Sequence, residues 1–233
     1  MRKILIFAGH EGALGRGIHT VLSGKDYDEI ILLSSRNSAK NSVRRERPDL
    51  ADGEVVSRLF AGIKSSSDTH FFLFSAIGGF SGGKAIWETG TDSALEMMNK
   101  NFVTSYNLLA AFTRLVKESA GGSVIFVSAW SGGHPDINRA AYASSKAALN
   151  HLIKSAALEG KEINLSVCGI APYLIDTPAN REWMPEERWG TMQKPEEVGE
   201  LVHQIFRFSH ILSGNIIELG ERLQLLNFHK AGE

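Results

Sequence analysis

A tyrosine and a lysine four positions apart are the residues of this sequence best suited to move a proton. Tyr142 and Lys146 enclose the run Ala-Ser-Ser at the start of a stretch with helical periodicity, so both side chains should project from one helical face. A phenol titrates at about pH 10, and a neighbouring ammonium favours the phenolate by charge attraction. The spacing therefore predicts Tyr142 as a general acid whose pKa is lowered by Lys146. The same spacing also arises by chance on many helices, so the pair needs support from other motifs.

A glycine-dense turn near the N-terminus could hold a dinucleotide. It lies between an apolar run and a helical stretch and reads Gly9-His10-Glu11-Gly12-Ala13-Leu14-Gly15. A pyrophosphate binds where backbone N–H groups converge at a helix N-terminus, and side chains larger than hydrogen would hold the phosphates away. Glycine clusters also serve ordinary tight turns, but the order of strand, turn and helix favours cofactor binding. The contacts expected from this turn are Gly9, Gly12, Ala13, Leu14 and Gly15.

The end of the second apolar run bears on which nicotinamide cofactor fits. It reads Leu33-Ser34-Ser35-Arg36, whereas an NAD-specific site would be expected to carry an acid here for the ribose 2′-hydroxyl. The planar guanidinium of Arg36, with the Ser35 hydroxyl beside it, suits the 2′-phosphate of NADP. A surface arginine in a loop is the alternative interpretation. The charge pattern therefore favours NADP(H) as the cofactor and leaves NAD(H) open.

Short apolar runs alternate with helical stretches along the chain, and this rhythm predicts the elements that position the motifs. The expected strands are residues 3–8, 29–34, 71–76, 123–128, 164–170 and 215–219, and the expected helices are residues 14–22, 54–63, 93–117, 139–158 and 195–208. Continuously apolar runs suit parallel strands that are buried on both faces. The pattern predicts an α/β fold: a single-domain, Rossmann-type, doubly wound parallel sheet with helices on both faces. Its topology also requires a strand near residues 41–47, where the sequence is polar.

Length and composition limit what the chain can be. With 233 residues and no repeat or long linker, we expect one domain over residues 1–233, its cofactor half at about 1–120 and its catalytic and substrate half at about 121–233. The 25 basic and 26 acidic residues nearly balance, which argues against a nucleic-acid partner. The apolar runs are too short to cross a membrane. Cys168 is the only cysteine, so an internal disulfide is excluded and a reducing cytoplasm is expected. Histidines at metal-ligand spacing are absent from the sequence, so we expect no metal.

Four motifs stand in the order and rough spacing of the short-chain dehydrogenase/reductase family, and the resemblance covers nearly the whole chain. They are the turn of residues 9–15, then Asn101, the run from Tyr142 to Lys146, and the segment of residues 172–177. The resemblance implies that Tyr142 donates the proton and that Lys146 lowers its pKa and holds the nicotinamide ribose. It also implies that Asn101 maintains a proton-relay water.

The resemblance implies further cofactor contacts. The family's Pro-Gly-x-x-x-Thr segment appears as Pro172-Tyr173-Leu174-Ile175-Asp176-Thr177, which places Thr177 on the nicotinamide carboxamide. The usual Asn-Asn-Ala-Gly appears as Ser75-Ala76-Ile77-Gly78, so the contact is expected to persist while the family's side chains do not. The contacts implied in this way are Asp49 and Leu50 for the adenine, then Ala76, Ile77, Gly78, Pro172 and Thr177.

Two departures from the family pattern concern the substrate. The substrate-orienting serine expected thirteen positions before the tyrosine is Ala129, which has no hydroxyl to bond a ketone oxygen. Ser128 and Ser131 flank it and are the candidates to replace that hydroxyl. Tyr173 stands where the family has a glycine.

These departures resemble the dihydropteridine reductase branch of the family. That branch shares the Gly-Ala-Leu-Gly turn, a Gly-Gly-aromatic-x-Gly-Gly loop seen here at residues 78–83, an alanine at the serine position, and an Asp-Thr-Pro-x-Asn-Arg segment seen here at residues 176–181. The resemblance implies a quinonoid dihydropterin as substrate, whose conjugated ring accepts hydride and proton without a serine-bound carbonyl. That branch carries an acid after its second strand and uses NADH, whereas Ser35 and Arg36 stand here.

Aromatic residues in loops near the expected site suit a flat, small-molecule substrate. The substrate contacts expected from this pattern are Phe80, Ser128, Ala129, Trp130, Ser131, Tyr173 and Trp183. The segment of residues 173–193 is long and carries two prolines, which predicts a lid that orders on substrate binding. By resemblance to the family, residues 93–117 and 139–158 would pair with a second subunit in a homodimer or homotetramer, with Leu109, Ala110, Phe112 and Leu115 on the inner face.

Two alternatives to reduction of a conjugated ring remain open from the sequence. One is a carbonyl reductase for ketones or 3-oxoacyl groups, with Ser128 or Ser131 replacing the missing hydroxyl. The other is a non-catalytic NADP-binding module that senses redox state. A pure binder has no need of a tyrosine with a tuned pKa, which favours an enzyme.

Overall fold

The computed structural model describes residues 1–33 and 49–223. Within them a six-stranded parallel sheet runs in the order β2-β1-β3-β4-β5-β6. The strands are β1 (Arg2–Ala8), β2 (Glu29–Leu33), β3 (Thr69–Ser75), β4 (Gly121–Val127), β5 (Leu165–Pro172) and β6 (Ile216–Leu219). All six apolar runs predicted as strands are confirmed, with ends that differ by one or two residues. The strand predicted at 41–47 lies outside the described residues.

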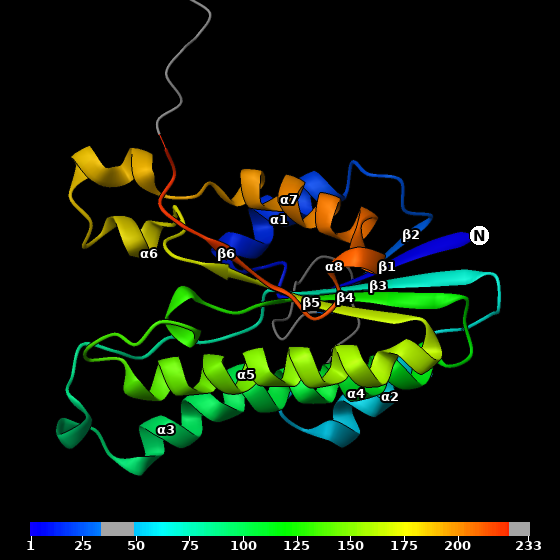
Figure 1. Cartoon of the computed structure of the whole chain (residues 1–233), viewed down its shortest axis with the longest axis horizontal. Helices are drawn as coiled ribbons and strands as arrows, with labels where there is room; N and C mark the ends of the chain where they lie inside the picture. The colour runs from blue at the N-terminus through cyan, green and yellow to red at the C-terminus, as the bar shows by residue number, and fades with distance from the viewer. Residues whose placement is uncertain (34–48, 224–233) are drawn as a thin grey trace, which may run out of the picture.

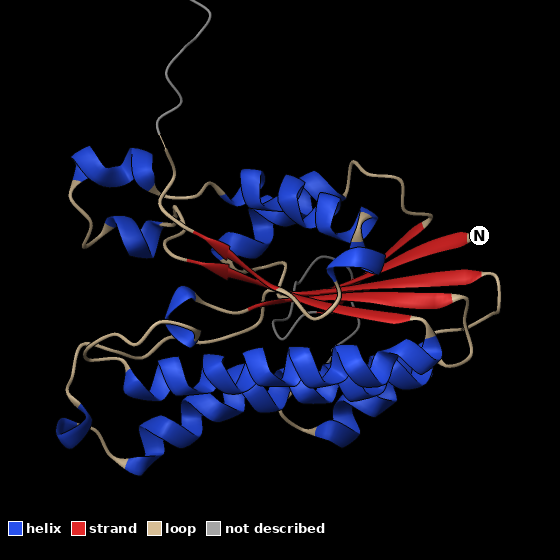
Figure 2. Cartoon of the chain, viewed as in Figure 1, coloured by secondary structure: helices blue, strands red, loops and turns tan. Residues whose placement is uncertain are grey.

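Helices cover both faces of this sheet (Figures 1 and 2). One face carries α1 (Ala13–Leu22), α7 (Pro195–Arg207) and the short α8 (Ser209–Leu212). The other carries α2 (Gly53–Ala61), α4 (Thr104–Val116) and α5 (Ala140–Glu159). The helix α3 (Thr91–Met98) precedes α4 and lies end to end with it in Figure 1. The predicted Rossmann-type, doubly wound α/β sheet is therefore confirmed.

The central strands are apolar over most of their length because both of their faces are buried, whereas the edge strand β2 leaves Leu32 42% exposed. In β1, Ile4 and Ile6 pack with the α2, α4 and α5 side, whereas Leu5 and Phe7 pack with the α1 and α7 side. Successive side chains of a strand point to opposite faces, so a sheet covered on both sides needs apolar residues at every position. This alternation explains why the strands could be predicted from continuous apolar runs in the sequence.

The long helix predicted over residues 93–117 is interrupted, which corrects the expectation of one continuous α-helix. A π-helical turn, η2 (Asn99–Val103), separates α3 from α4. The Thr104 N–H bonds to the carbonyl of Asn99, five residues back, and the Thr104 hydroxyl donates to the same carbonyl over 3.0 Å. Such single π turns shift the helical register by one residue and often occur at functional sites. Here the turn contains Asn101, one of the predicted site residues.

The apolar residues predicted on an intersubunit face lie mostly inside the chain's own core. Leu109, Phe112 and Leu115 are buried in the cluster between the sheet, α2 and α5, and Ala110 remains partly exposed. Their apolar pattern is thus explained by the fold of one chain.

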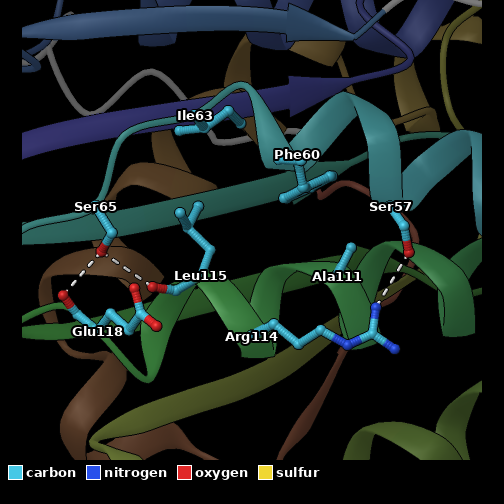
Figure 3. A pocket seen from close by; sticks show the side chains of 9 residues that line it. Ser57, Phe60, Ile63, Ser65, Ala111, Arg114, Leu115 and Glu118 are labelled. Atoms are coloured by element: carbon cyan, nitrogen blue, oxygen red, sulfur yellow. Dashed lines mark hydrogen bonds between the residues drawn. The ribbon is translucent and has the colours of Figure 1, made fainter.

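A surface hollow of about 310 Å³ lies between α2 and α4 (Figure 3). On one side the Ser65 hydroxyl donates to the carbonyls of Leu115 and Glu118, and on the other Arg114 donates to the Ser57 hydroxyl over 3.1 Å. None of the predicted site residues lines it. The hollow therefore belongs to the packing of the two helices and not to the predicted site.

The loops that follow the strands gather at the carboxyl edge of the sheet, at the left of Figure 1. This is where ligands bind in open parallel α/β sheets, because the strand ends and helix N-termini face the same space.

Across residues 1–33 and 49–223, no helix combines the length and the apolar character required to traverse a lipid bilayer.

Candidate active site

The predicted cofactor turn follows β1 and contacts the turn that follows β3. Gly9 has φ +88°, in the left-handed region, and a Cβ added to it would lie 2.9 Å from the Ala76 carbonyl carbon and 2.9 Å from the Ile77 nitrogen. A Cβ added to Gly15 would lie 2.0 Å from the Gly9 carbonyl oxygen. Only glycine fits at either position, so the turn is closed by backbone packed on backbone. The structure thus brings the predicted contacts Ala76 and Ile77 against the glycine turn.

The start of α1 has the features that an anionic ligand requires. Its N-cap is Gly12, and among the described residues no side chain caps the helix. No acid stands in its first turn, which begins at Ala13 and Leu14. The backbone N–H groups at a helix N-terminus bind anions and carry the positive end of the helix dipole. The cradle therefore fits a dinucleotide pyrophosphate, which Gly12, Ala13, Leu14 and Gly15 would hold through their backbone.

The predicted adenine contact is fixed against α4. The Asp49 carboxylate accepts a hydrogen bond from the Ala51 N–H over 2.9 Å, and Asp49 is exposed. Leu50 is buried, and the Asn107 amide of α4 donates to the Leu50 and Ala51 carbonyls over 3.2 and 2.9 Å. Ser35 and Arg36, predicted to select between NADP and NAD, lie outside the described residues.

Tyr142 and Lys146 lie in the first two turns of α5, and the hydrogen bond of the ammonium goes to a main-chain carbonyl. Lys146 Nζ donates to the Val127 carbonyl at the end of β4 over 2.8 Å and lies 6.0 Å from the centroid of the Tyr142 ring. Burial raises the pKa of Tyr142 to about 12, against a smaller lowering by Arg139, and burial lowers the pKa of Lys146 to about 8. The expectation of a lowered tyrosine pKa is therefore wrong for the protein alone, because desolvation outweighs the distant ammonium.

Asn101 joins the loop after β3 to α5. Its side chain is fully buried; the amide nitrogen donates to the Gly79 carbonyl over 3.0 Å and to the Ser145 hydroxyl over 2.9 Å, and the amide oxygen accepts from the Gly79 N–H over 2.9 Å. The side chain thus fixes main chain and helix instead of facing solvent. Ser145, which sequence reasoning left unassigned, is the contact on α5, and its place inside the run from Tyr142 to Lys146 was the available signal.

Gly78 is the point where these groups converge. A Cβ added there would lie 2.7 Å from Asn101 Oδ1 and 3.2 Å from Lys146 Nζ. The loop after β3 can approach both side chains this closely only because residue 78 has none. The structure therefore brings together Gly78, Asn101, Lys146 and Tyr142 at the carboxyl edge.

The hydroxyl groups beside Ala129 differ in their freedom to reach a substrate. Ala129 is buried at the start of η3 (Trp130–Gly132). The Ser128 hydroxyl is also buried and donates to Asn150 Oδ1 over 2.5 Å, so it is directed at α5. Ser131 is partly exposed within η3. Sequence reasoning did not identify Asn150, although it follows Lys146 by one helical turn.

Aromatic side chains stand on both sides of this region. Phe80 meets Tyr142 edge to face with ring centroids 5.0 Å apart, and it is 63% exposed. Trp130 stacks on His134 and presents an edge contact to Tyr173, with ring centroids 4.2 and 5.9 Å apart. The structure therefore groups four of the predicted aromatic and phenolic residues around the carboxyl edge.

The segment after β5 forms two short turns, and Arg188 in the second of them is bonded to Glu221. Thr177 caps α6 (Pro178–Arg181) by accepting from the Asn180 N–H, and Asp176 forms a two-bonded ion pair with Arg181 over 2.5 and 2.7 Å. Arg181 in turn lies 4.5 Å from the Trp189 ring in η5 (Glu186–Thr191). Trp183, predicted as a substrate contact, is 61% exposed between these turns. Pro172 ends β5, and closure of the segment as a lid stays a prediction.

Over the part of the chain that the structure describes, no three His, Cys, Asp or Glu side chains are grouped so that they could hold a metal ion. The groups brought together at the carboxyl edge include the Tyr142 phenol, the Lys146 ammonium, the Asn101 amide and backbone donors. These groups suit hydride transfer with proton donation, since the nicotinamide supplies the hydride and the phenol the proton.

Comparison with known proteins supports this chemistry. A family model described as short chain dehydrogenase matches residues 3–188. The chain is 27% identical to the dihydropteridine reductase of Dictyostelium discoideum over 203 residues, which cover 86% of each chain. It is 24% identical to the 3-oxoacyl acyl-carrier-protein reductase MabA of Mycobacterium tuberculosis over 212 residues, covering 86% of this chain and 83% of that one. The solved structure of ElxO with NADP bound superposes with a TM-score of 0.80 at 16% identity, covering 94% of this chain and 97% of the other.

The family match spans most of the chain and includes the glycine turn, the π-helical turn with Asn101, and the tyrosine and lysine of α5. The fold and the grouping of these residues at the carboxyl edge agree with that match. This chain belongs to the short-chain dehydrogenase family and is an NAD(P)-dependent oxidoreductase.

Proposed function

We propose that this enzyme is an NADP(H)-preferring reductase that transfers a hydride to a small, flat, conjugated acceptor such as a quinonoid dihydropterin, with Tyr142 as proton donor. The observation that carries the proposal is the pair Ala129 and Ser128. Ala129 has no hydroxyl, and the Ser128 hydroxyl is buried and donates to Asn150. A ketone needs a donor on its oxygen, whereas a conjugated ring accepts hydride and proton at its own atoms. The 27% identity to a dihydropteridine reductase points the same way.

The residues of the site act on the proton. The reduced nicotinamide supplies the hydride when bound. Tyr142 Oη gives its proton to the acceptor and becomes a phenolate, which is favoured when a positive charge stands close to it. Lys146 is charged below about pH 8 and is anchored to the Val127 carbonyl by one hydrogen bond. Release of that bond would let the ammonium turn toward the phenol and the ribose. Asn101 holds the loop of Gly78 and Gly79 so that this space stays open.

The preference for NADP(H) rests on sequence. The described end of β2 is Leu33, and Ser35 and Arg36 follow where an acid would favour NAD. The structural relative ElxO has NADP bound, which is compatible with this preference. We expect Arg36→Ala to weaken NADPH binding by about tenfold, as expected for loss of a charged hydrogen bond to phosphate, and to leave NADH binding unchanged. Equal loss for both cofactors would argue against a 2′-phosphate contact.

The test of the reaction is a substrate panel with purified enzyme and each reduced cofactor. The proposal expects NADPH to be oxidised in the presence of quinonoid dihydropterin. The oxidation is measured as the loss of the nicotinamide absorbance at ~340 nm. Tyr142→Phe should retain cofactor binding and lose about a thousandfold in kcat, within the range that a general acid contributes. No turnover of any planar acceptor by the unaltered enzyme would reject the proposal.

A second candidate is a carbonyl reductase for ketones or 3-oxoacyl groups. It is favoured by the partial exposure of Ser131 in η3 and by the 24% identity to a 3-oxoacyl reductase. In that reaction Ser131 would donate to the substrate carbonyl. Ketone reduction that is lost in Ser131→Ala, with no activity on dihydropterin, would establish this candidate.

A non-catalytic NADP-binding sensor is the remaining candidate from the sequence. It would bind cofactor through the same glycine turn and would not require Tyr142. Tight cofactor binding without turnover on the whole panel, equal in the unaltered protein and in Tyr142→Phe, would favour it.

The assembly we propose is a homodimer or homotetramer through α4 and α5. A groove of about 500 Å³ runs between these helices, and Tyr106, which lines it, is 52% exposed. An aromatic ring on such a face is typical of subunit interfaces. Sedimentation of the enzyme should show the assembly, and Tyr106→Glu should shift it to monomer.

We place the enzyme in a reducing compartment such as the cytoplasm, because its one cysteine, Cys168, is a buried free thiol.

A further inference from the structure

Trp130 is held in place by two residues that no part of the proposed reaction uses. Its indole stacks on the imidazole of His134, with centroids 4.2 Å apart and an angle of 17° between the rings. His134 Nε2 lies 3.0 Å from Glu218 Oε1 on β6. Because a carboxylate only accepts, Nε2 carries the hydrogen of this bond. The strand β6 therefore fixes the imidazole, and the imidazole fixes one face of the indole.

The loop that carries His134 lies close to β6. A Cβ added to Gly133 would lie 3.1 Å from Glu218 Oε1, so the loop after η3 approaches the carboxylate closely. The Tyr173 ring meets Trp130 at 87°, with centroids 5.9 Å apart. Three elements, η3, β5 and β6, thus contribute to the position of one indole, which nevertheless stays partly exposed.

The element that carries the indole, η3, packs on the helix that carries the proposed proton donor. A Cβ added to Gly132 would lie 3.0 Å from Lys146 Cβ, so η3 packs directly on the turn of α5 that carries this lysine. Tyr142 stands one helical turn earlier on α5, with Phe80 against its ring.

We propose that His134 and Glu218 are positioning residues that hold Trp130 as a rigid wall of the substrate site, and that this wall selects a fused heteroaromatic ring by stacking. The inference rests on the proposed function and deepens it. An indole that is already fixed loses little conformational freedom when a ligand stacks on it, so the preorganised ring binds more tightly than a mobile one. Flat, conjugated rings gain this contact, and small non-planar carbonyl compounds do not.

The test is equilibrium binding, because it does not depend on turnover. Oxidised pterin is titrated by calorimetry into the complex of the enzyme with NADP⁺. Trp130→Leu should weaken pterin binding about tenfold, as expected for loss of one stacking contact. His134→Ala should weaken it by about fivefold, and His134→Phe, which keeps a ring in the stack but cannot donate to Glu218, should recover only part of that loss. The double variant Trp130→Leu with His134→Ala should bind no more weakly than Trp130→Leu alone, because His134 acts through Trp130.

Two controls separate positioning from simple stability. His210→Ala removes an exposed histidine of α8 and should leave pterin binding unchanged. NADP⁺ affinity should be the same in all variants, and KM for quinonoid dihydropterin should rise in His134→Ala while kcat stays within about twofold. Equal pterin binding by His134→Ala and the unaltered enzyme would overturn the inference, as would losses that simply add in the double variant.

Failure of this inference can be told from failure of the proposed function. If the enzyme reduces other planar acceptors but binds no pterin, or binds it independently of Trp130, the aromatic wall is rejected and the reductase stands. If pterin binds in a manner that depends on Trp130 and His134 while no acceptor is reduced, the wall stands and the reductase is rejected.

Discussion

The cofactor side and the substrate side of the carboxyl edge are built from different parts of the chain. On the cofactor side the contacts are backbone groups, closed by Gly9 and Gly15, where an added Cβ would meet main-chain atoms at 2.9 and 2.0 Å. On the substrate side they are aromatic side chains, among them Phe80 and Trp130, supplied by separate loops. Backbone sites admit few sequences, whereas side-chain sites can vary while the fold is kept. We therefore expect substrate choice to depend on the loops after β3, β4 and β5.

The largest effect on binding should come from adding one methyl group on the cofactor side. Gly15→Ala forces its Cβ against the Gly9 carbonyl, and overpacking of this kind costs about 2 kcal/mol, equivalent to about 30-fold in affinity. Fluorescence titration with NADPH measures the loss. Gly24→Ala is the matched control, because its Cβ would have its nearest contact at 3.6 Å, and it should bind like the unaltered enzyme. Unchanged NADPH affinity in Gly15→Ala would show that the close backbone packing at the glycine turn is not needed for cofactor binding.

The second prediction concerns the charge of Lys146, which lies between the cofactor side and the substrate side. Burial lowers the pKa of this lysine to about 8, so the side chain is charged below that pH and neutral above it. Because kcat/KM reports the free enzyme, it should be level at lower pH and decline as pH rises through about 8, to about a tenth at pH 9. In Lys146→Arg the guanidinium stays charged, so any residual activity should lack this decline. A profile that is flat to about pH 9 in the unaltered enzyme would contradict a requirement for the ammonium.

The smallest effect is expected from the aromatic pair on the substrate side. Phe80 is 63% exposed, and Phe80→Leu removes its edge-to-face contact with Tyr142. Such a contact is worth about 1 kcal/mol, or about fivefold in binding of the substrate. KM for a planar acceptor should rise by that factor while NADPH affinity is unchanged. Phe80→Trp should restore the low KM. A loss of NADPH affinity equal to the rise in KM would show that the two sides are not separable.

Much of the fold could be predicted from the sequence because its signals are local. The doubly buried strands are continuous apolar runs, and the glycine turn follows the first of them directly, so neither depends on distant residues. The site was predictable where a motif is contiguous, as in the run from Tyr142 to Lys146. The bonds of Asn101 to Gly79 and Ser145, of Ser128 to Asn150 and of His134 to Glu218 were not, because each joins different elements of the fold.

The same reason explains the wrong prediction for the Tyr142 pKa. Spacing along a helix places Lys146 on the correct face, but it does not reveal that the Val127 carbonyl takes the ammonium or that burial dominates the phenol. The pKa relevant to catalysis is therefore that of the enzyme with cofactor bound, where we expect a released Lys146 to lie closer to the phenol.

The most direct test of the account is an ultraviolet titration of the Tyr142 phenolate, obtained as the difference between the unaltered enzyme and Tyr142→Phe, without cofactor and with NADP⁺. Without cofactor, the difference signal should titrate at a pKa of about 12. With NADP⁺ bound, we expect that pKa to fall by about 2, as nearby positive charge produces. A difference signal that titrates at the same pH with and without NADP⁺ would contradict the assignment of Tyr142 as the proton donor.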